Sequence, residues 1–189
     1  QLAAAPGDDV SGRSGASPMA ALSLVVAVGV RGPGLVLSMS PPVILQSRRT
    51  ECGLAALTMI ANHFGHDLDL TAMRRRFGEL SPDLRSLLSI ADSLGLTGHP
   101  LRLGLGDMRR LSLPAVLHWE FDHFVVLVKV GRRGVVIHDP SSGRRASDWN
   151  AFGSALTGVA VEFTLAPDFS KLSARRLPSQ RGLVQSFRR

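Results

Sequence analysis

The chain has 189 residues, of which 44% are hydrophobic and only one is a cysteine. This length suits one folded domain with extensions, and the apolar fraction excludes a chain that is disordered throughout. A single cysteine excludes an internal disulfide, so the sequence does not indicate a disulfide-stabilised secreted fold. It also contains no uninterrupted apolar run of about 18 residues, so we expect no transmembrane helix.

The net charge of +7 comes mostly from the end of the chain. Residues 166–189 contain six basic residues and one acidic residue, whereas residues 40–165 contain 14 basic and 12 acidic residues. A nucleic-acid-binding domain normally carries its basic stripe on the folded body, so we expect no nucleic-acid partner. The basic end is typical of a solvated tail or of a segment near anionic lipid.

The sequence divides into three parts. Residues 1–40 begin with small and polar residues and include an apolar stretch, Met19–Val30, that is shorter than a membrane span. We predict a disordered N-terminal extension there. Residues 41–166 carry regular apolar patterns and form the predicted folded domain, and residues 167–189 form a predicted basic linker.

Helices are predicted in the first half of the domain. Apolar residues recur at helical spacing over Thr50–Phe64, and Gly65 follows at the position of a C-terminal cap. A short helix is expected over Thr71–Phe77. Ser81-Pro82-Asp83 is expected to open another helix with Ser81 as its N-cap, because serine caps helices well and proline is tolerated in the first turn.

Strands are predicted in the second half, where the segments become short, rich in valine and separated by turn residues. The expected strands are Leu96–Leu103, Ala115–Trp119, Phe124–Val130, Val135–His138 and Val159–Leu165, with a last short helix over Asp148–Leu156. Helices followed by strands predict an α+β domain in which a mostly antiparallel sheet packs on a helical half.

Cys52 lies at the start of the first long predicted helix, followed by Gly53. A helix N-terminus presents unpaired N–H groups and a partial positive charge, which favour the reactive thiolate. Gly53 adds no side chain that would crowd an approaching carbonyl group. The alternative is that Cys52 is a small core residue, which is the commonest role of a free cysteine.

His123 and Asp139 could complete a catalytic arrangement with Cys52. His123 follows a turn-like Glu120-Phe121-Asp122 segment and opens an apolar strand, where it could accept a proton from a thiol. Asp139 ends the next predicted strand, so it could bind the far nitrogen of His123 and fix its tautomer. The alternatives are a histidine at a strand edge and an aspartate that only forms a turn.

Gln46 precedes Cys52 by six residues. Its side-chain amide could form an oxyanion hole together with the backbone N–H of Cys52. A glutamine near a cysteine carries almost no information by itself.

Four blocks in this order resemble a known family. They are Gln46-x5-Cys52-Gly53-Leu54-Ala55, Leu117-His118-Trp119-x3-His123-Phe124-Val125-Val126-Leu127, His138-Asp139-Pro140-x2-Gly143 and Thr157-Gly158-Val159-Ala160-Val161-Glu162. They are similar to the bacteriocin-processing cysteine peptidase domain of peptidase-containing ABC transporters, of the colicin V type. The resemblance covers about residues 42–165 and does not extend to residues 1–40.

The resemblance implies a papain-like fold and an endopeptidase that removes leader peptides after a Gly-Gly or Gly-Ala pair. It assigns Cys52 as the nucleophile, His123 as the general base and then acid, and Asp139 as the orienting residue. Gln46 would be the oxyanion donor. The small residues before the cleavage site imply a narrow substrate-binding cleft near Gly53 and Trp119, without a metal or another cofactor.

The resemblance also implies partners. An apolar face of the leader helix would dock on a hydrophobic patch of the domain. Residues 167–189 would link the domain to transmembrane and ATPase domains at the cytoplasmic face of a bacterial inner membrane, since basic residues favour that side. The sequence contains no G-x-x-x-x-G-K-[ST] phosphate loop of its own. The domain alone is expected to be monomeric.

Two alternatives to a peptidase stay open on the sequence. One is a domain that recognises leader peptides without cleaving them, and the other is a nucleic-acid-binding protein that uses its basic end. His63-x2-His66 with Asp67 and Asp69 has a metal-like appearance, but two histidines without a third ligand of that kind favour ordinary surface polarity.

Overall fold

The computed structural model describes residues 40–78 and 83–174. Nearly all of the predicted N-terminal extension, including Met19–Val30, lies outside these ranges, as does most of the predicted linker, so both remain predictions. Within residues 40–78 and 83–174, every helix is too short or too polar to cross a membrane.

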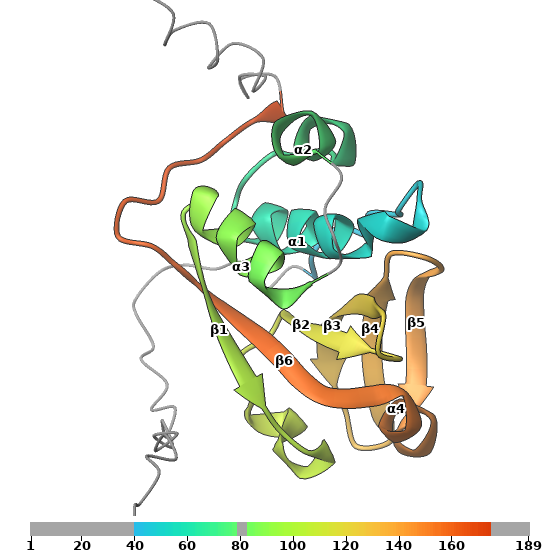
Figure 1. Ribbon diagram of the computed structural model, residues 1–189. Coiled ribbons are helices and arrows are strands. Elements are labelled where there is room, and N and C mark those ends of the chain that lie inside the picture. The colour runs from blue at the N-terminus through green and yellow to red at the C-terminus, as the bar shows by residue number, and fades with distance from the viewer. Residues whose placement is uncertain (1–39, 79–82, 175–189) are drawn as a thin grey trace, which may run out of the picture. The chain divides into compact units, whose positions relative to one another are not determined.

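Three helices come first in the described chain (Figure 1). A 3₁₀ turn over Arg49–Glu51 leads into α1, Cys52–His63, which is followed by α2, Leu70–Phe77, and α3, Leu84–Ser93. These bounds confirm the predicted helices to within a few residues. Most of the side chains of α1 are buried, because this helix packs between the sheet and the other two helices.

The start of α3 differs from the prediction. Asp83 is the N-cap, in an extended conformation, and its carboxylate accepts a hydrogen bond of 2.8 Å from the backbone N–H of Ser86. Ser81 and Pro82 lie outside the described residues. Aspartate caps a helix as well as serine does, and the sequence offered both within three positions.

The strands form one antiparallel sheet in the order β1-β6-β2-β3-β4-β5. Their bounds are Leu96–Arg102 for β1, Ala115–Trp119 for β2, His123–Val130 for β3, Gly134–Asp139 for β4, Gly143–Asp148 for β5 and Leu156–Leu165 for β6. A 3₁₀ segment, Leu105–Arg110, follows β1, and α4, Trp149–Ala155, precedes β6. The predicted α+β class with an antiparallel sheet is confirmed.

β5 is the strand that the sequence analysis missed. Its sequence, Gly-Arg-Arg-Ala-Ser-Asp, has no apolar alternation because β5 is an edge strand with most of its side chains exposed. β6 is also longer than predicted: it begins at Leu156, which pairs with Trp119. This extension brings the end of α4 beside the turn between β2 and β3.

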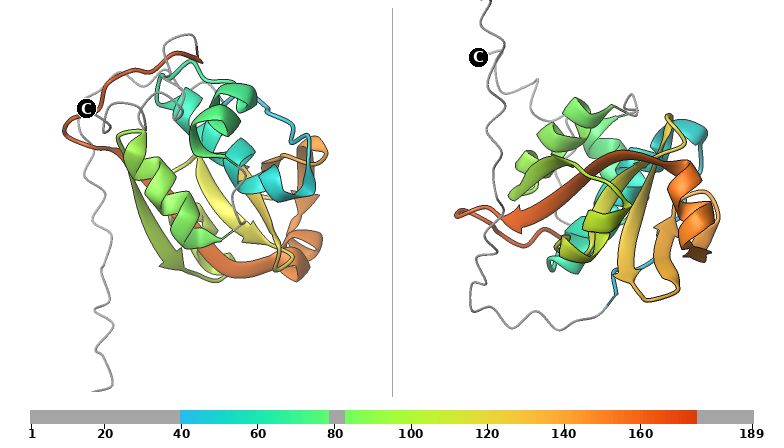
Figure 2. Two further views of the ribbon diagram at one scale, coloured as in Figure 1. Left: turned by 45° about the horizontal axis from the view of Figure 1, so that its top comes forward. Right: turned by 90° about the horizontal axis from the view of Figure 1, so that it is seen from below.

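Each face of the sheet has its own core, because side chains alternate along the strands. Val116, Phe124 and Val126 face α1 and α3, whereas Leu117 and Val125 face Met108 and the α4 residue Phe152. Figure 2 shows α1, α2 and α3 gathered on one face of the sheet. The N-terminus of α1 therefore lies over one end of the central strands, where the candidate site is found.

Candidate active site

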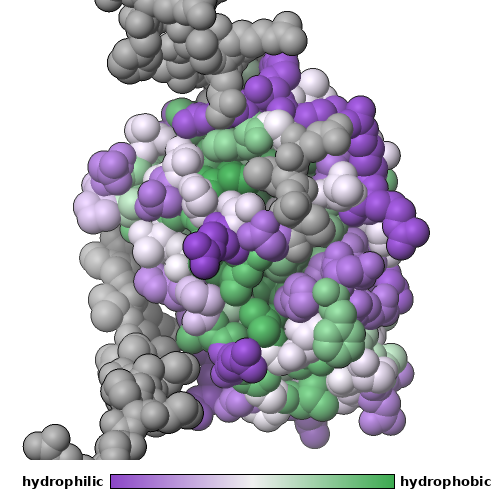
Figure 3. All heavy atoms as spheres, in the orientation of Figure 1, coloured by the Kyte–Doolittle hydropathy of each residue, from purple (hydrophilic) through white to green (hydrophobic). Residues whose placement is uncertain are grey.

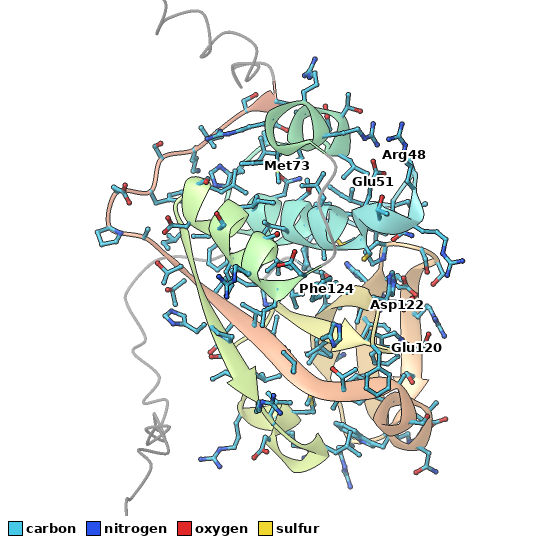
Figure 4. The ribbon with its side chains drawn as sticks, viewed as in Figure 1. Arg48, Glu51, Met73, Glu120, Asp122 and Phe124 are labelled. Carbon is cyan, nitrogen blue, oxygen red and sulfur yellow. The ribbon has the colours of Figure 1, made fainter. Side chains whose placement is uncertain are left out.

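Cys52 is the first residue of α1 and is buried. The residue before it, Glu51, is 2% exposed and fixes the backbone at this helix start (Figure 4). Its Oε2 accepts hydrogen bonds from the N–H groups of Ser47 and Arg48, at 3.0 and 3.1 Å, and its Oε1 binds Arg74 of α2 at 2.6 Å. The hydrogen bond from Arg74 lowers the pKa of Glu51, so this carboxylate is charged and holds the segment before α1 in place.

His123 is the first residue of β3 and lies opposite Trp119 of β2. Its Nε2 lies 2.8 Å from Oδ1 of Asp139, and the ring makes a second side-chain hydrogen bond with Cys52. Nδ1 is the nitrogen that remains for the thiol. Burial alone would lower the pKa of His123, but the hydrogen bonds to Asp139 and Cys52 outweigh it and raise the pKa to about 9.

Asp139 is the last residue of β4, and its side chain is 3% exposed. Besides His123, its carboxylate accepts hydrogen bonds from the Ser141 N–H and hydroxyl at 2.8 and 2.7 Å, from the Ser142 hydroxyl at 2.8 Å and from Arg145 at 3.2 Å. Burial raises the pKa of Asp139, but the bonds from His123 and the serines outweigh it and hold that pKa well below its usual range. The carboxylate is therefore ionised and fixed in orientation.

The fold brings together three of the residues selected from the sequence. Cys52 comes from α1, His123 from β3 and Asp139 from β4, because the antiparallel pairing of β3 with β4 sets the start of one beside the end of the other. A thiol, an imidazole and a carboxylate in one hydrogen-bonded chain can generate a thiolate nucleophile beside an imidazolium acid. The side chain of His123 is 16% exposed, so solvent reaches the pair from the imidazole side.

The backbone of Gln46 is held beside Asp139. Its N–H donates a hydrogen bond of 2.8 Å to the carbonyl of Pro140, which follows Asp139 directly. Its side-chain Oε1 is buried and has no hydrogen-bond partner among the described residues. The role of the Gln46 amide as an oxyanion donor remains a prediction.

Two residues predicted to bind substrate have clear packing roles. The indole ring of Trp119 is buried and lies 5.4 Å, between ring centroids, from the ring of Phe152. A side chain at Gly53 would point toward Phe124, with 3.4 Å between the added Cβ and a ring carbon, and toward Leu87. Their participation in substrate binding remains a prediction.

Sequence reasoning missed the residues that support the candidate site. Glu51 precedes the cysteine, and Ser141, Ser142 and Arg145 surround the carboxylate of Asp139. The sequence signal was an Asp-Pro-Ser-Ser segment, in which aspartate followed by serines is typical of a turn held by side-chain hydrogen bonds. The turn interpretation and the catalytic interpretation of Asp139 are compatible, because its carboxylate makes both sets of bonds.

His63 and His66 have a spacing that resembles that of metal ligands. No group of three or more potential metal-ligating side chains occurs within residues 40–78 and 83–174. His66 is buried, and its Nδ1 accepts the N–H of Leu172 at 2.9 Å while its Nε2 donates to the carbonyl of Leu94 at 2.9 Å. Both ring nitrogens therefore have structural partners.

His138, the neighbour of Asp139, is 2% exposed and faces the helical side of the sheet opposite Val126. Neither ring nitrogen has a hydrogen-bond partner among the described residues. Burial lowers the pKa of His138, so the folded protein keeps this ring neutral with an unsatisfied N–H group. An ordinary histidine in the unfolded chain binds a proton below about pH 6.5, which favours unfolding there.

Replacing His138 with leucine is therefore expected to raise the melting temperature by a few degrees at neutral pH. The increase should be larger at about pH 5, because the unfolded variant has one fewer group to protonate. Thermal unfolding at both pH values tests this, with His99→Leu, at an exposed position of β1, as the matched control. A lower melting temperature of His138→Leu at both pH values would mean that the ring has a partner after all.

Known proteins resemble this chain in sequence. The family model for the peptidase C39 family matches residues 40–168. The chain belongs to the peptidase C39 family. Two Escherichia coli proteins are each 40% identical to this C39 domain over 148 residues: the colicin V secretion/processing ATP-binding protein CvaB and the probable microcin-H47 secretion/processing ATP-binding protein MchF. The matches cover 77% of this chain and 21% of each relative, so the chain spans about a fifth of their length.

Solved structures agree with this assignment. The C39 domain resembles a double glycine motif protease from an AMS/PCAT transporter, in complex with the leader peptide, with a TM-score of 0.63 and 27% identity over 67% of this chain and 92% of that one. The peptidase domain of Streptococcus ComA has a TM-score of 0.60 at 20% identity, covers 67% of this chain and 99% of that one, and supports the fold alone. The predicted family resemblance, papain-like fold and cysteine peptidase class are confirmed.

Proposed function

We propose that this C39 domain is a cysteine endopeptidase that removes the leader from a secreted, bacteriocin-type precursor peptide after a Gly-Gly or Gly-Ala pair. The observation that carries the proposal is the hydrogen-bonded chain from Cys52 through His123 to Asp139. Cysteine chemistry of this kind needs a thiol, a base and a group that orients the base, and all three side chains meet at one end of the sheet.

The reaction has two steps. The Cys52 thiolate attacks the carbonyl carbon of the second residue of the pair, and the carbonyl oxygen becomes an oxyanion that the Cys52 N–H and the Gln46 amide would stabilise. His123 then gives its proton to the departing amine of the mature peptide, which leaves the leader bound to Cys52 as a thioester. His123 next removes a proton from water, which hydrolyses the thioester and releases the leader with a free carboxylate.

The leader peptide is the proposed partner of the face shown in Figure 3. Apolar side chains gather there in a band between α3 and the strands below it (Figure 3). Leu84 and Leu88, one helical turn apart on α3, are half-buried against the core and leave part of their surface open. A complex of a related protease with its leader peptide supports this proposal, because that protein has the same fold.

We further propose that the domain acts as one part of an exporter. The relatives CvaB and MchF are secretion/processing ATP-binding proteins of which this chain covers only a fifth. Residues 167–189 would then lead to transmembrane and ATPase domains, with the peptidase at the cytoplasmic face of the bacterial inner membrane. The isolated domain would be a monomer that uses no metal or other cofactor.

The pH dependence of cleavage should follow His123. Because the pKa of His123 is raised to about 9, the imidazolium persists through neutral pH and loses its proton only near pH 9. We therefore expect kcat/KM to stay high well above about pH 6.5, where an ordinary histidine loses its proton, and to fall at about pH 9. A pH–rate profile on a short precursor checks this, and an upper limb near the ordinary histidine value would contradict it.

The proposed function is tested with synthetic precursor peptides and mass spectrometry. A precursor whose leader ends in Gly-Gly should be cut directly after the pair, and a peptide with Val in place of the second Gly should stay intact. Cys52→Ala should cleave neither peptide. Intact Gly-Gly peptide that still binds to the wild-type protein would favour a recognition domain without peptidase activity, and absence of both cleavage and binding would overturn the proposal.

A further inference from the structure

The turn between β2 and β3 has an unusual backbone. Glu120 and Phe121 both have positive φ angles, +46° and +66°, a region that favours glycine and asparagine. A bulky residue in this region is destabilised, because its Cβ comes too close to the following carbonyl oxygen. The turn has no glycine, so its conformation is maintained at the expense of stability.

The Phe121 side chain is hardly buried. It is 85% exposed, the highest value for a large hydrophobic residue within the described ranges. Its two neighbours in the sequence, Glu120 and Asp122, are exposed acidic residues, and both are labelled in Figure 4. A phenylalanine that is both strained and exposed contributes nothing to the core that would explain its presence.

The turn is nevertheless held firmly in place. Trp119 and His123 pair across its base, and the N–H of Glu120 donates a hydrogen bond of 2.9 Å to the carbonyl of Ala155 at the end of α4. Phe121 is therefore presented on a fixed support. Strained backbone at such a position is typical of functional sites, where the fold enforces a conformation that the sequence does not favour.

Phe121 also lies close to the reacting groups. It precedes His123 by two residues, so their Cα atoms are at most about 7.6 Å apart. An extended peptide advances about 3.3 Å per residue, so three residues on one side of the scissile bond span about 10 Å, which is longer than that separation. This separation allows the ring to contact the peptide near the scissile bond.

We propose that Phe121 is a substrate-binding residue, whose exposed ring packs against one apolar side chain of the precursor peptide within about three residues of the scissile bond. This inference rests on the proposed peptidase function and extends it to a specific contact. The strain at Glu120 and Phe121 is then explained, because it directs an apolar ring into the path of the peptide. Binding buries the ring, which supplies the stabilisation that the free domain lacks.

The test compares Phe121→Ala and Phe121→Gly with the wild-type protein. Both variants should lower kcat/KM for a Gly-Gly precursor roughly tenfold, mainly through KM, because they remove a binding contact and leave the reacting groups unchanged. Phe121→Gly should at the same time raise the melting temperature, because glycine accepts the positive φ angle. The alkylation rate of Cys52 should remain that of the wild type in both variants.

Two controls separate this effect from general ones. Glu120→Gly relaxes the neighbouring positive φ angle and keeps the ring, so it should raise the melting temperature with little change in KM. Leu165→Ala removes another exposed apolar side chain, 49% exposed at the far end of β6, and should change neither cleavage nor binding. An alanine scan of the peptide then identifies the contact, since one apolar position should lose affinity with the wild type but not with Phe121→Ala.

The outcomes distinguish this inference from the proposed function. Cleavage by the wild type with unchanged KM in Phe121→Ala would overturn the inference and leave the peptidase intact. A lower melting temperature in both Phe121 variants, together with slower Cys52 alkylation, would show a structural role and also overturn it. Absence of cleavage and of peptide binding by the wild type would overturn the proposed function and the inference with it.

Discussion

Replacing His123 with alanine is expected to lower kcat/KM for a Gly-Gly precursor by about 10³-fold or more. The imidazole makes hydrogen bonds with both Cys52 and Asp139, so it is the only link between the thiol and the carboxylate among the described residues. Its removal takes away the proton acceptor that generates the thiolate and the proton donor that the departing amine needs. Single-turnover kinetics with the purified variant measure the loss.

The control for His123→Ala is His99→Ala. His99 is an exposed histidine of β1 that bonds Thr164 at 3.1 Å, far along the sheet from the candidate site. The His99→Ala variant should cleave at the wild-type rate. Both His123→Ala and His99→Ala should keep the far-UV circular dichroism of the wild type. Cleavage by His123→Ala within tenfold of the wild-type rate would remove His123 from the mechanism.

Replacing Asp139 with asparagine is expected to lower kcat/KM by roughly 10²- to 10⁴-fold. Asparagine keeps the shape of the side chain but loses the negative charge that stabilises the His123 imidazolium. It also offers an N–H₂ group where the carboxylate now accepts bonds from Ser141 and Ser142, so the turn after β4 must adjust. Steady-state kinetics over a range of pH measure both consequences.

The pH profile separates the electrostatic role of Asp139 from a structural one. Loss of the carboxylate should move the upper limb of the profile downward from about pH 9, because the hydrogen bond from His123 to a charged acceptor raises the pKa of the imidazole. Ser142→Ala is the matched control, since it removes a bond to Asp139 without touching His123. An Asp139→Asn profile with an unshifted upper limb would restrict Asp139 to holding the turn.

Much of the fold could be predicted because its signals are local. Valine-rich runs between turn residues predicted β2, β3 and β4, and the helical spacing of apolar residues predicted α1. β5 could not be predicted in this way, because its two arginines and its serine leave no apolar alternation. An edge strand depends on backbone pairing with β4, and that information is in the sheet rather than in the strand.

The residues of the candidate site, too, could be predicted only where the signal is local in the sequence. Cys52, His123 and Asp139 could be selected because a helix start, a strand start and a strand end each carried a reactive residue type. Glu51 could not be selected in this way, because its partner Arg74 is distant in the sequence. The two side chains meet only through the packing of α1 on α2. The conformation of Phe121 could not be predicted either, since Glu-Phe-Asp lacks the glycine that is typical of positive φ angles.

The position of His138 could not be predicted from the sequence either. A histidine beside Asp139 could be read as a second catalytic candidate or as a packing residue, and the sequence does not say which face of β4 it occupies. The pairing of His138 with Val126 puts it on the helical side, whereas His123 bonds Asp139 at the end of the strand. Strand register, which depends on the turns, decided between the two roles.

The rate of Cys52 alkylation as a function of pH tests the central claim most directly, because it needs no knowledge of the natural substrate. Iodoacetamide should modify Cys52 faster in the wild type than in His123→Ala at about pH 6, because the imidazole takes up the thiol proton and the resulting thiolate is the reactive form. In His123→Ala the rate should be low at about pH 6 and rise steeply toward alkaline pH, as for an ordinary thiol. The same steep rise in both proteins would contradict a Cys52–His123 ion pair and the peptidase mechanism built on it.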